Sequence, residues 1–232
     1  MYLSKLLINA YSREFRRDYA DIRETHRTVM SGYPDVPNDT PVRQSQAVLW
    51  RLDRVRRGFV QYVQSLGWPD WSRLPGDYLT EPAQVRSLQP VLDAIGPGRR
   101  FAFRLAANPV RTIARRPGRL PAESGNRTHG IKVALRDPQE QLEWLIRKGE
   151  RHGFVIPTAD SGRPHAALSL YRTLTGQKRV GDRGPLTIES VRFEGHLIVT
   201  DAATFTDALR TGIGRGKAYG CGLISLAPPQ RS

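Results

Sequence analysis

The segment DPQEQLEWLIRKG, residues 137–149, contains the clearest helix signal of the sequence and decides how the second half of the chain folds. Asp137 is a typical N-cap residue, Pro138 suits the first helical position, and Glu140 completes a capping box. Apolar residues then recur at helical spacing, at Leu142, Leu145 and Ile146. The segment therefore predicts a helix with one buried face.

Alternating apolar and polar residues predict strands on both sides of this helix. The predicted strands cover residues 100–107, 167–174, 186–193, 196–200 and 223–226. Asp201 caps a second helix, which is predicted to run to Leu209. The resulting order, β-α-β-β-α-β, is that of the ferredoxin-like fold, which RNA-recognition domains share, although a fold by itself assigns no function.

The first half of the chain begins β-α-β-β. Residues 2–8 form a short β-prone run, and Asp21 with Glu24 three residues later has the spacing of a capped helix start. Two further apolar runs, at residues 48–55 and 59–63, are separated by two arginines and a glycine, which predicts a hairpin.

Residues 67–98 are rich in proline and tryptophan and have weak periodicity, which is typical of a connection between domains. The 232 residues suffice for two small domains. We therefore predict an α+β protein with an N-terminal domain at residues 1–95 and a C-terminal domain at residues 96–232.

Positive charge extends along the whole chain. The 36 lysines and arginines outnumber the 22 acidic residues, which gives a net charge of +14 and a pI near 10.7. The hydrophobic content of 39% is that of a globular protein, so this charge must lie on a folded surface. Such a surface favours a polyanionic partner, because each neutralised phosphate releases condensed counterions. Nucleic acid is the leading candidate, and an anionic membrane is the rival.

The sequence contains no apolar run that approaches the length needed to span a membrane, and its first residues are too polar for a secretory signal. Cys221 is the single cysteine, which forbids an internal disulfide and a cysteine-based zinc site. Both features predict a cytoplasmic protein without a membrane partner. Cys221 itself is interpreted as a small buried residue.

Residues 212–222 contain five glycines, interleaved with Arg215 and Lys217. Because glycine lacks Cβ and permits positive φ, the backbone N–H groups at Gly214 and Gly216 could approach a phosphate closely. The loop is no P-loop, since it lacks Ser or Thr after the lysine, and it runs from helix to strand, unlike the dinucleotide fingerprint. A turn whose glycines only let two strands pack explains the pattern equally well.

His26 lies four residues after Ile22 and three before Val29, so it belongs to the apolar stripe of the early helix. Imidazole can take a proton from a ribose 2′-OH or give one to a departing 5′-oxygen, as metal-free RNA cleavage requires. A hydrogen-bonded packing role is the competing interpretation.

Tyr2 and Tyr219 could stack on bases but are interpreted as ordinary strand aromatics. The other histidines are scattered, so we predict no metal site.

Two groups of cations are candidates for RNA binding. A predicted ridge beside His26 consists of Arg13, Arg16, Arg17, Arg23 and Arg27. A predicted hairpin tip between the strands at 167–174 and 186–193 carries Arg172, Lys178, Arg179 and Arg183. Charge runs are usually solvated faces only, but Asp182 is the only acidic residue between Arg172 and Arg183, which favours contact with phosphates.

Four segments resemble the CasE-type endoribonucleases, which mature CRISPR RNA in the type I-E Cascade system. The segments are residues 1–6 (MYLSKL), 103–109 (FRLAANP), 193–195 (FEG) and 212–228, which ends in GLISLAP. They follow the family order from the first residues almost to the last, so the resemblance covers essentially the whole chain. The terminal segment is the most specific.

The resemblance implies two tandem ferredoxin-like domains, a groove that holds the stem-loop of the CRISPR repeat RNA, and cleavage at the 3′ base of the stem. It also implies that His26 serves as general base or acid while the 2′-OH attacks the adjacent phosphorus. The products would be a 2′,3′-cyclic phosphate and a 5′-OH, with no metal and no cofactor. Family members retain the cleaved RNA and assemble with other Cascade subunits.

This chain departs from the family pattern at Arg23, because relatives commonly carry a tyrosine three residues before the histidine. Arg23 stays protonated and cannot act as a base, but it can stabilise the charge that builds on the phosphorane. Lys217 is a second candidate for that role. The alternative to an enzyme is a non-catalytic RNA-binding subunit in which His26 only packs. A duplex DNA binder is disfavoured, since no helix-turn-helix or zinc motif is present.

Overall fold

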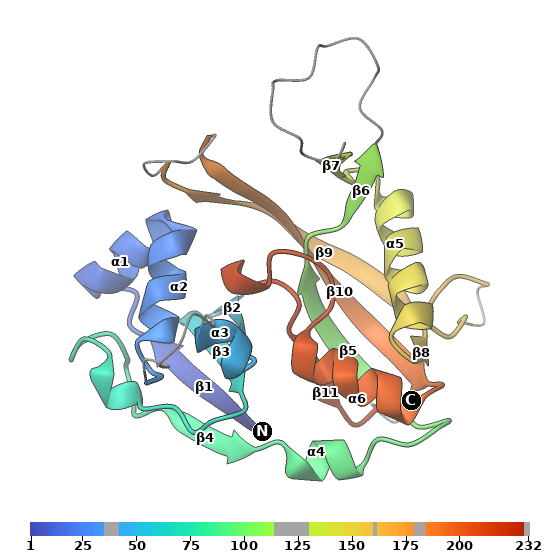
Figure 1. The fold of residues 1–232 in the computed structure, drawn as a ribbon, viewed down its shortest axis with the longest axis horizontal. Helices are drawn as coiled ribbons and strands as arrows, with labels where there is room; N and C mark the ends of the chain where they lie inside the picture. Colours follow the sequence, from blue (N-terminus) through green and yellow to red (C-terminus); the bar gives the residue numbers. More distant parts are fainter. Residues whose placement is uncertain (35–41, 114–129, 160–161, 179–183, 230–232) are drawn as a thin grey trace, which may run out of the picture.

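The computed structural model describes residues 1–34, 42–113, 130–159, 162–178 and 184–229, whose strands form two main antiparallel sheets (Figure 1). The first sheet has the strand order β2-β3-β1-β4. Its strands are β1 (Tyr2–Ile8), β2 (Leu49–Val55), β3 (Gly58–Ser65) and β4 (Gln84–Ser87). The predicted first strand is thus confirmed, as is the predicted hairpin, in which Val55 pairs with Gly58 at the turn.

Two short helices, α1 (Arg13–Ala20) and α2 (Ile22–Met30), pack on this sheet. The chain bends between them at Asp21, whose φ of −134° and ψ of 110° are extended, so one helix cannot continue. The Oδ1 atom of Asp21 accepts the N–H of Arg23 at 2.9 Å. This bond confirms the predicted capped helix start, while Ser12 caps α1 separately.

The second sheet has the order β11-β5-β10-β8, and β9 also pairs with β10. Its ferredoxin-like unit consists of β5 (Arg100–Ala107), α5 (Pro138–Arg151), β9 (Ala166–Gly176), β10 (Leu186–Val199), α6 (Ala202–Thr211) and β11 (Ile224–Ala227). The predicted order of elements is confirmed, although the two runs at 186–193 and 196–200 form one long strand. Both sheets place the first and third strands of their unit side by side, as tandem ferredoxin-like folds do.

Shorter elements complete the chain. They are α3 (Val42–Ser45), η1 (Trp71–Arg73), α4 (Gln89–Asp93), β6 (Val110–Ile113), β7 (Ile131–Ala134), β8 (Phe154–Val155) and η2 (Lys217–Tyr219). The predicted boundary after residue 95 falls between α4 and β5. Among the helices of the described residues, none has the length and apolar character needed to cross a membrane.

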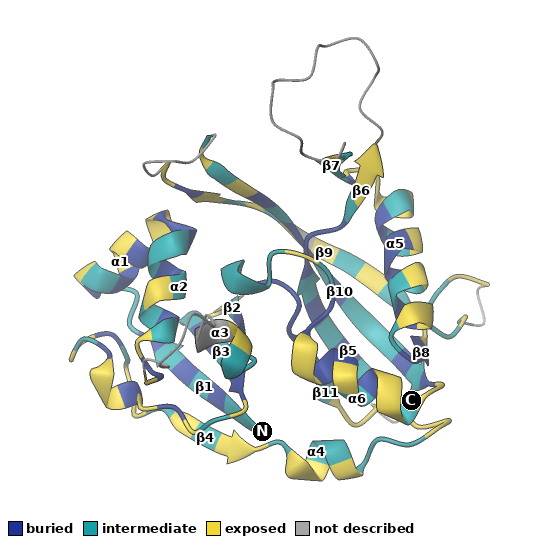
Figure 2. Cartoon of the chain, in the orientation of Figure 1, coloured by how far each residue is buried: buried dark blue, intermediate teal, exposed yellow. Residues whose placement is uncertain are grey.

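Each sheet has a hydrophobic core of its own, and the buried residues follow the inner faces of the strands and helices (Figure 2). In α5, the predicted cap is confirmed, because Asp137 accepts the N–H of Glu140. The predicted buried face is confirmed at Leu145, and the half-buried Leu142 packs against the same core, whereas Ile146 is only half-buried. Trp144, at 5% exposure, adds to that face and stacks on Phe193.

The two sheets are joined at Asp53, a carboxylate of β2 that is 1% exposed. It accepts hydrogen bonds from Arg51 at 2.9 Å and from Arg104 and Arg192 of the second sheet, each at 3.1 Å. Arg51 also donates to the carbonyl oxygen of Leu223 at 3.3 Å. These bonds fix how the sheets meet and concentrate positive charge between them.

Candidate active site

His26 of α2 faces the glycine-rich loop of the other half of the chain. Its ring meets that of Tyr219 edge to face, with 5.9 Å between the ring centroids and 65° between the planes. Tyr219 lies in the 3-10 turn η2 and is half-buried, so its interpretation as a strand aromatic is wrong. His26 is half-buried as well, and the Nδ1 atom of its imidazole is buried.

Two features hold η2 in place against α2. The Nε1–H of Trp50 in β2 donates to the carbonyl oxygen of Ala218 at 3.1 Å. Gly220 follows with a φ of +76°, and a Cβ there would lie 2.9 Å from the Trp50 ring, so only glycine fits this close approach. The predicted glycine-rich turn is therefore confirmed at this end of the loop.

The predicted phosphate-binding residues of the loop precede η2. Gly214 packs against the Trp144 ring, and Gly216 has the left-handed φ of +76° that begins the 3-10 turn. Arg215 is exposed and pairs through its backbone with Asn108 at the end of β5. The glycines thus have a structural role, and phosphate contact by Gly214, Arg215 and Gly216 stays a prediction.

The two predicted charge-stabilising cations lie on the elements that meet at His26. Arg23 is one helical turn before His26, and its Cγ lies against Gly176 of β9. Lys217 is the first residue of η2 and lies near enough to the end of α5 to act on His152 there. Burial lowers the pKa of His152, and the charges of Lys148 and Lys217 lower it further. Contact of either cation with a scissile phosphate stays a prediction.

Four arginines of the predicted basic ridge are exposed on α1 and α2, whereas the fifth, Arg23, is half-buried. Among the described residues, Arg13 and Arg16 form no ion pair, whereas two other arginines pair locally. Arg17 contacts Asp18 at 3.0 Å, and Arg27 contacts Glu24 at 2.5 Å. Both pairs are largely solvent-exposed on the arginine side, so they reduce the charge of the ridge without removing the guanidinium groups from the surface.

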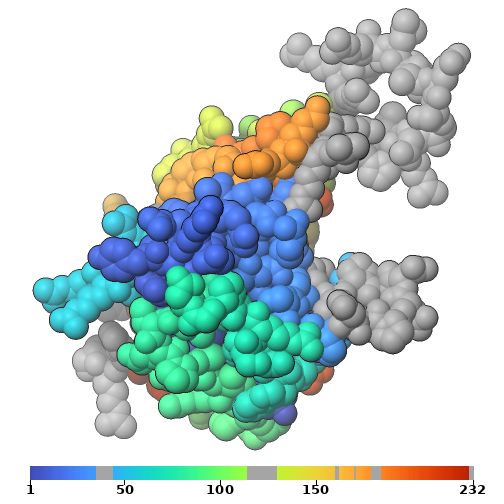
Figure 3. Space-filling view, turned by 90° about the vertical axis from the view of Figure 1, so that its left-hand side faces the viewer, coloured from blue at the N-terminus to red at the C-terminus, as the bar shows by residue number. Residues whose placement is uncertain are grey.

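The hairpin of β9 and β10 contacts α1 (Figure 3). Arg172 of β9 lies over the ring of Tyr19, 5.5 Å from its centroid, and donates to its hydroxyl at 2.7 Å. No local sequence pattern marks Tyr19, because the contact joins residues 153 positions apart. Lys178 is exposed just beyond β9, whereas Arg179 and Arg183 lie outside the described residues.

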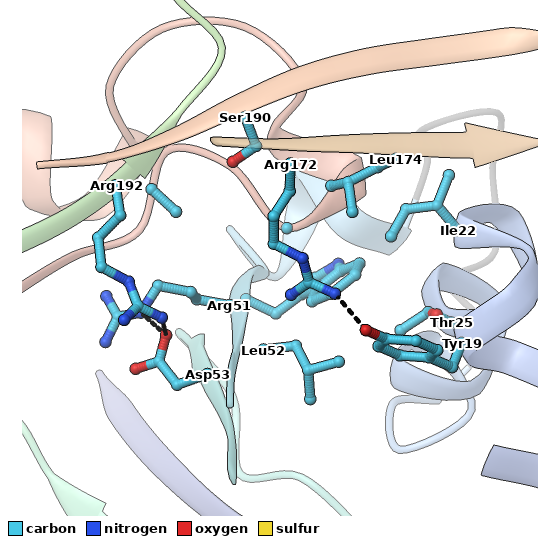
Figure 4. A pocket seen from close by; sticks show the side chains of 13 residues that line it. Tyr19, Ile22, Thr25, Arg51, Leu52, Asp53, Arg172, Leu174, Ser190 and Arg192 are labelled. Atoms are coloured by element: carbon cyan, nitrogen blue, oxygen red, sulfur yellow. Dashed lines mark hydrogen bonds and ion pairs between the residues drawn. The ribbon is translucent and has the colours of Figure 1, made fainter. Parts of the chain in front are cut away.

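A pocket opens between this hairpin and the first sheet (Figure 4). Arginines from three strands line it, namely Arg51, Arg172 and Arg192. Asp53 accepts from Arg51 and Arg192 but cannot neutralise all three, so the pocket is cationic. Arg51 and Arg192 could not be predicted, since isolated arginines on β-strands carry no local sequence pattern.

The candidate active site can supply proton transfer and electrostatic stabilisation. An imidazole lies at the contact between the two halves, with fixed cations on the neighbouring turns. Among the described residues, no group of three or more histidine, cysteine, aspartate and glutamate side chains is arranged to hold a metal ion. Fold and site together define a class: a protein of two ferredoxin-like domains, the fold of RNA-recognition modules, with a histidine where they meet.

The chain belongs to the CRISPR-associated protein family, whose model, described as "CRISPR associated protein", matches residues 1–228. It is 36% identical to the CRISPR-associated endoribonuclease Cse3 of Thermus thermophilus, over 98% of this chain and 100% of Cse3. It is 30% identical to the CRISPR system Cascade subunit CasE of Escherichia coli K12, again over 98% and 100%. The resemblance to CasE-type proteins is therefore confirmed.

A solved structure agrees with this assignment. The structure of CRISPR endoribonuclease Cse3 bound to a 19-nucleotide RNA matches with a TM-score of 0.78 and 34% identity. The match covers 98% of this chain and 100% of that one. The similarity therefore includes both sheets and the loop that carries Tyr219.

Proposed function

We propose that this chain is a CRISPR endoribonuclease that binds the stem-loop of the repeat RNA and cuts at the 3′ base of the stem. The observation that carries the proposal is the contact of His26 with Tyr219, which places an imidazole between the two ferredoxin-like units and beside the cationic elements. Full-length similarity to Cse3 supports the substrate class.

The proposed reaction exchanges one P–O bond for another and needs two proton transfers. A base takes the proton of the 2′-OH, the 2′-oxygen attacks the adjacent phosphorus, and the bond from phosphorus to the 5′-oxygen breaks. The departing 5′-oxygen takes up a proton, which leaves a 2′,3′-cyclic phosphate and a 5′-OH. His26 supplies one or both transfers, and Arg23 and Lys217 stabilise the charge on the phosphorane.

The basic surfaces would hold the RNA. We propose that Arg13, Arg16, Arg17 and Arg27 of the helices, with Arg172 and Lys178 of the hairpin, contact phosphates of the stem. The protein would then retain the cleaved RNA and join other Cascade subunits in the cytoplasm. The division into domains at residues 1–95 and 96–232 belongs to the same proposal, and a metal or cofactor has no step in it.

The second candidate is a non-catalytic RNA-binding subunit. Arg23 favours it, because the family pattern described above has a tyrosine at this position. In that case His26 would only pack against Tyr219, and the cationic surfaces would account for the whole function.

Single-turnover cleavage of the cognate repeat hairpin by the wild type and by His26→Ala separates the two candidates. We expect His26→Ala to lose about 10²-fold or more in rate, as removal of a general acid or base typically does, while binding the RNA normally. His165→Ala is the matched control, because His165 is exposed and its ring contacts only His196 among the ring pairs of the described residues. Equal rates for both variants would reject catalysis by His26, and tight binding without cleavage by the wild type would support the non-catalytic subunit.

A further inference from the structure

One carboxylate connects the hairpin of β9 and β10 to the helix that carries His26. Asp21 is 6% exposed, and each of its two oxygens accepts a different backbone N–H. Oδ1 accepts from Arg23 in the first turn of α2 at 2.9 Å. Oδ2 accepts from Gln177, just beyond β9, at 3.2 Å. Arg23 is 2 positions and Gln177 is 156 positions from Asp21 in the sequence. The carboxylate that caps α2 therefore also binds the distant hairpin.

The hairpin also approaches α2 more closely than a side chain at the contact would allow. A Cβ at Gly176 would lie 2.9 Å from Cγ of Arg23 and 3.2 Å from Oδ1 of Asp21. Gly176 is buried, and its φ is not in the left-handed region, so an alanine there would be strained only by this contact. Glycine is thus required by the approach and not by the backbone conformation.

A second contact lies further along the same hairpin. Arg172 rests on Tyr19 of α1, as described above, on the same side of the hairpin as Gly176. Two points of attachment prevent the hairpin from pivoting about either one. The distance between the hairpin and His26, which is five residues after Asp21 on α2, is therefore fixed by the protein itself.

We propose that the junction of Asp21 and Gly176 sets the position of the cut relative to the stem, with Asp21 as a positioning residue. This inference rests on the proposed function. If the hairpin holds the stem while α2 presents His26, the junction determines which phosphate reaches the imidazole. A shift of about 1 Å at a reacting centre can cost on the order of 10²-fold in rate. A loosened junction should therefore slow cleavage and let it occur at more than one phosphate.

Gly176→Ala tests the proposal, with Gly184→Ala as the matched control. Both glycines belong to the ends of the same hairpin, but a Cβ at Gly184 would meet nothing within 4 Å. The probes are the cognate repeat hairpin for cleavage and the same RNA with a 2′-deoxy nucleotide at the cut for affinity. For Gly176→Ala we expect a saturating single-turnover rate about tenfold to a hundredfold below that of Gly184→Ala, with products cut at more than one position.

Asp21→Asn provides a second variant that keeps the fold. An amide has one acceptor oxygen and a donor in place of the other, so it can keep only one of the two bonds of Asp21. Asparagine remains a good N-cap residue, so α2 should keep its cap, and urea unfolding should show only the cost of the one N–H that loses its acceptor. Asp137→Asn is the control, because the side chain of Asp137 caps α5 and, in the described structure, accepts only from the N–H of Glu140. We expect Asp21→Asn, and not Asp137→Asn, to lower the rate and broaden the cut.

The outcomes separate a positioning role from a merely structural one. A structural role would lower affinity or stability but leave the saturating rate and the cut position unchanged. If Gly176→Ala and Asp21→Asn match their controls in both readouts while the wild type cleaves, the inference fails and the proposed function stands. If the wild type does not cleave, the proposed function fails and takes this inference with it.

Discussion

At the scale of single residues, the environment of His26 decides what its imidazole can do. The contact with Tyr219 restrains the ring from one side, while α2 restrains its backbone. Side chains held in this way need little reorganisation when a substrate arrives. Cys221, in contrast, is fully buried, as predicted. Burial raises the pKa of its thiol to about 12, so the thiol stays protonated and unreactive at neutral pH.

Replacement of Tyr219 tests whether the ring or the hydroxyl matters. Tyr219→Phe keeps the edge-to-face contact, so we expect a cleavage rate close to that of the wild type. Tyr219→Ala frees the imidazole to adopt other rotamers, and we expect a loss of about tenfold at saturating protein, within the range that misplacement produces. Single-turnover rates measure both variants. A large loss for Tyr219→Phe would contradict a purely positioning role and assign chemistry to the hydroxyl.

His196 predicts how stability depends on pH. Burial lowers the pKa of His196, and the nearby His165 and Arg100 lower it further. The unfolded chain, with an ordinary value of about 6.5, therefore binds a proton more readily than the folded protein does. Stability should fall as pH drops from about 6.5 toward the lower folded pKa of His196. Melting temperatures between pH 8 and pH 5 measure this fall, and His196→Gln should make it shallower; an unchanged slope would contradict the account.

At the scale of elements, local signals in the sequence predicted most of the strands and helices. Asp137 and Asp201 cap α5 and α6 as predicted, because an N-cap bond reaches only three residues along the chain. The buried face of α5 was predicted less well, since Trp144 owes its burial to Phe193 on a distant strand. Apolar spacing predicted that His26 lies beside the buried face of its helix, where the structure has it half-buried. Tyr19 was not identified and Tyr219 was misinterpreted as a strand aromatic, because their partners are far away in sequence.

The anchoring of η2 makes a prediction at this scale. Trp50→Phe removes the Nε1–H that bonds to the carbonyl oxygen of Ala218, so η2 should shift away from α2. We expect a slower cut together with a modest loss of stability, about 1–3 kcal/mol for the carbonyl left without its donor.

Trp71→Phe is the matched control for that variant. It also removes an indole hydrogen bond, to Ser4 at 2.9 Å, but lies on η1 away from the glycine-rich loop. Urea unfolding and single-turnover cleavage should show similar stability losses for the two variants and slower cleavage only for Trp50→Phe. Equal cleavage rates would contradict the anchoring role.

At the scale of the whole molecule, Asp53 joins the two sheets and thereby holds the two sides of the site together. Its carboxylate is surrounded by Arg51, Arg104 and Arg192, and Arg104 also contacts Glu194. The two carboxylates thus balance part of the positive charge of these three arginines inside the protein. No sequence pattern predicts such a cluster, because its members come from three strands of two sheets.

Removal of that carboxylate should destabilise the protein strongly. Asp53→Ala leaves three guanidinium groups without their shared partner, and breaking a buried pair typically costs about 3–5 kcal/mol. Glu143→Ala is the control, since its pair with Arg147 spans 3.8 Å on the surface and should contribute about 0–1 kcal/mol. Urea unfolding compares the two. Similar small losses for both variants would show that the cluster does not hold the sheets together.

The most direct test of the central claim is the chemistry of the cut itself. The wild type should cleave the repeat hairpin in excess EDTA and leave a 2′,3′-cyclic phosphate and a 5′-OH, which end-group analysis identifies. A 2′-deoxy nucleotide at the cut should abolish cleavage while leaving binding intact. Cleavage that stops in EDTA, or that continues on the 2′-deoxy RNA, would contradict a metal-free attack by the 2′-OH assisted by His26.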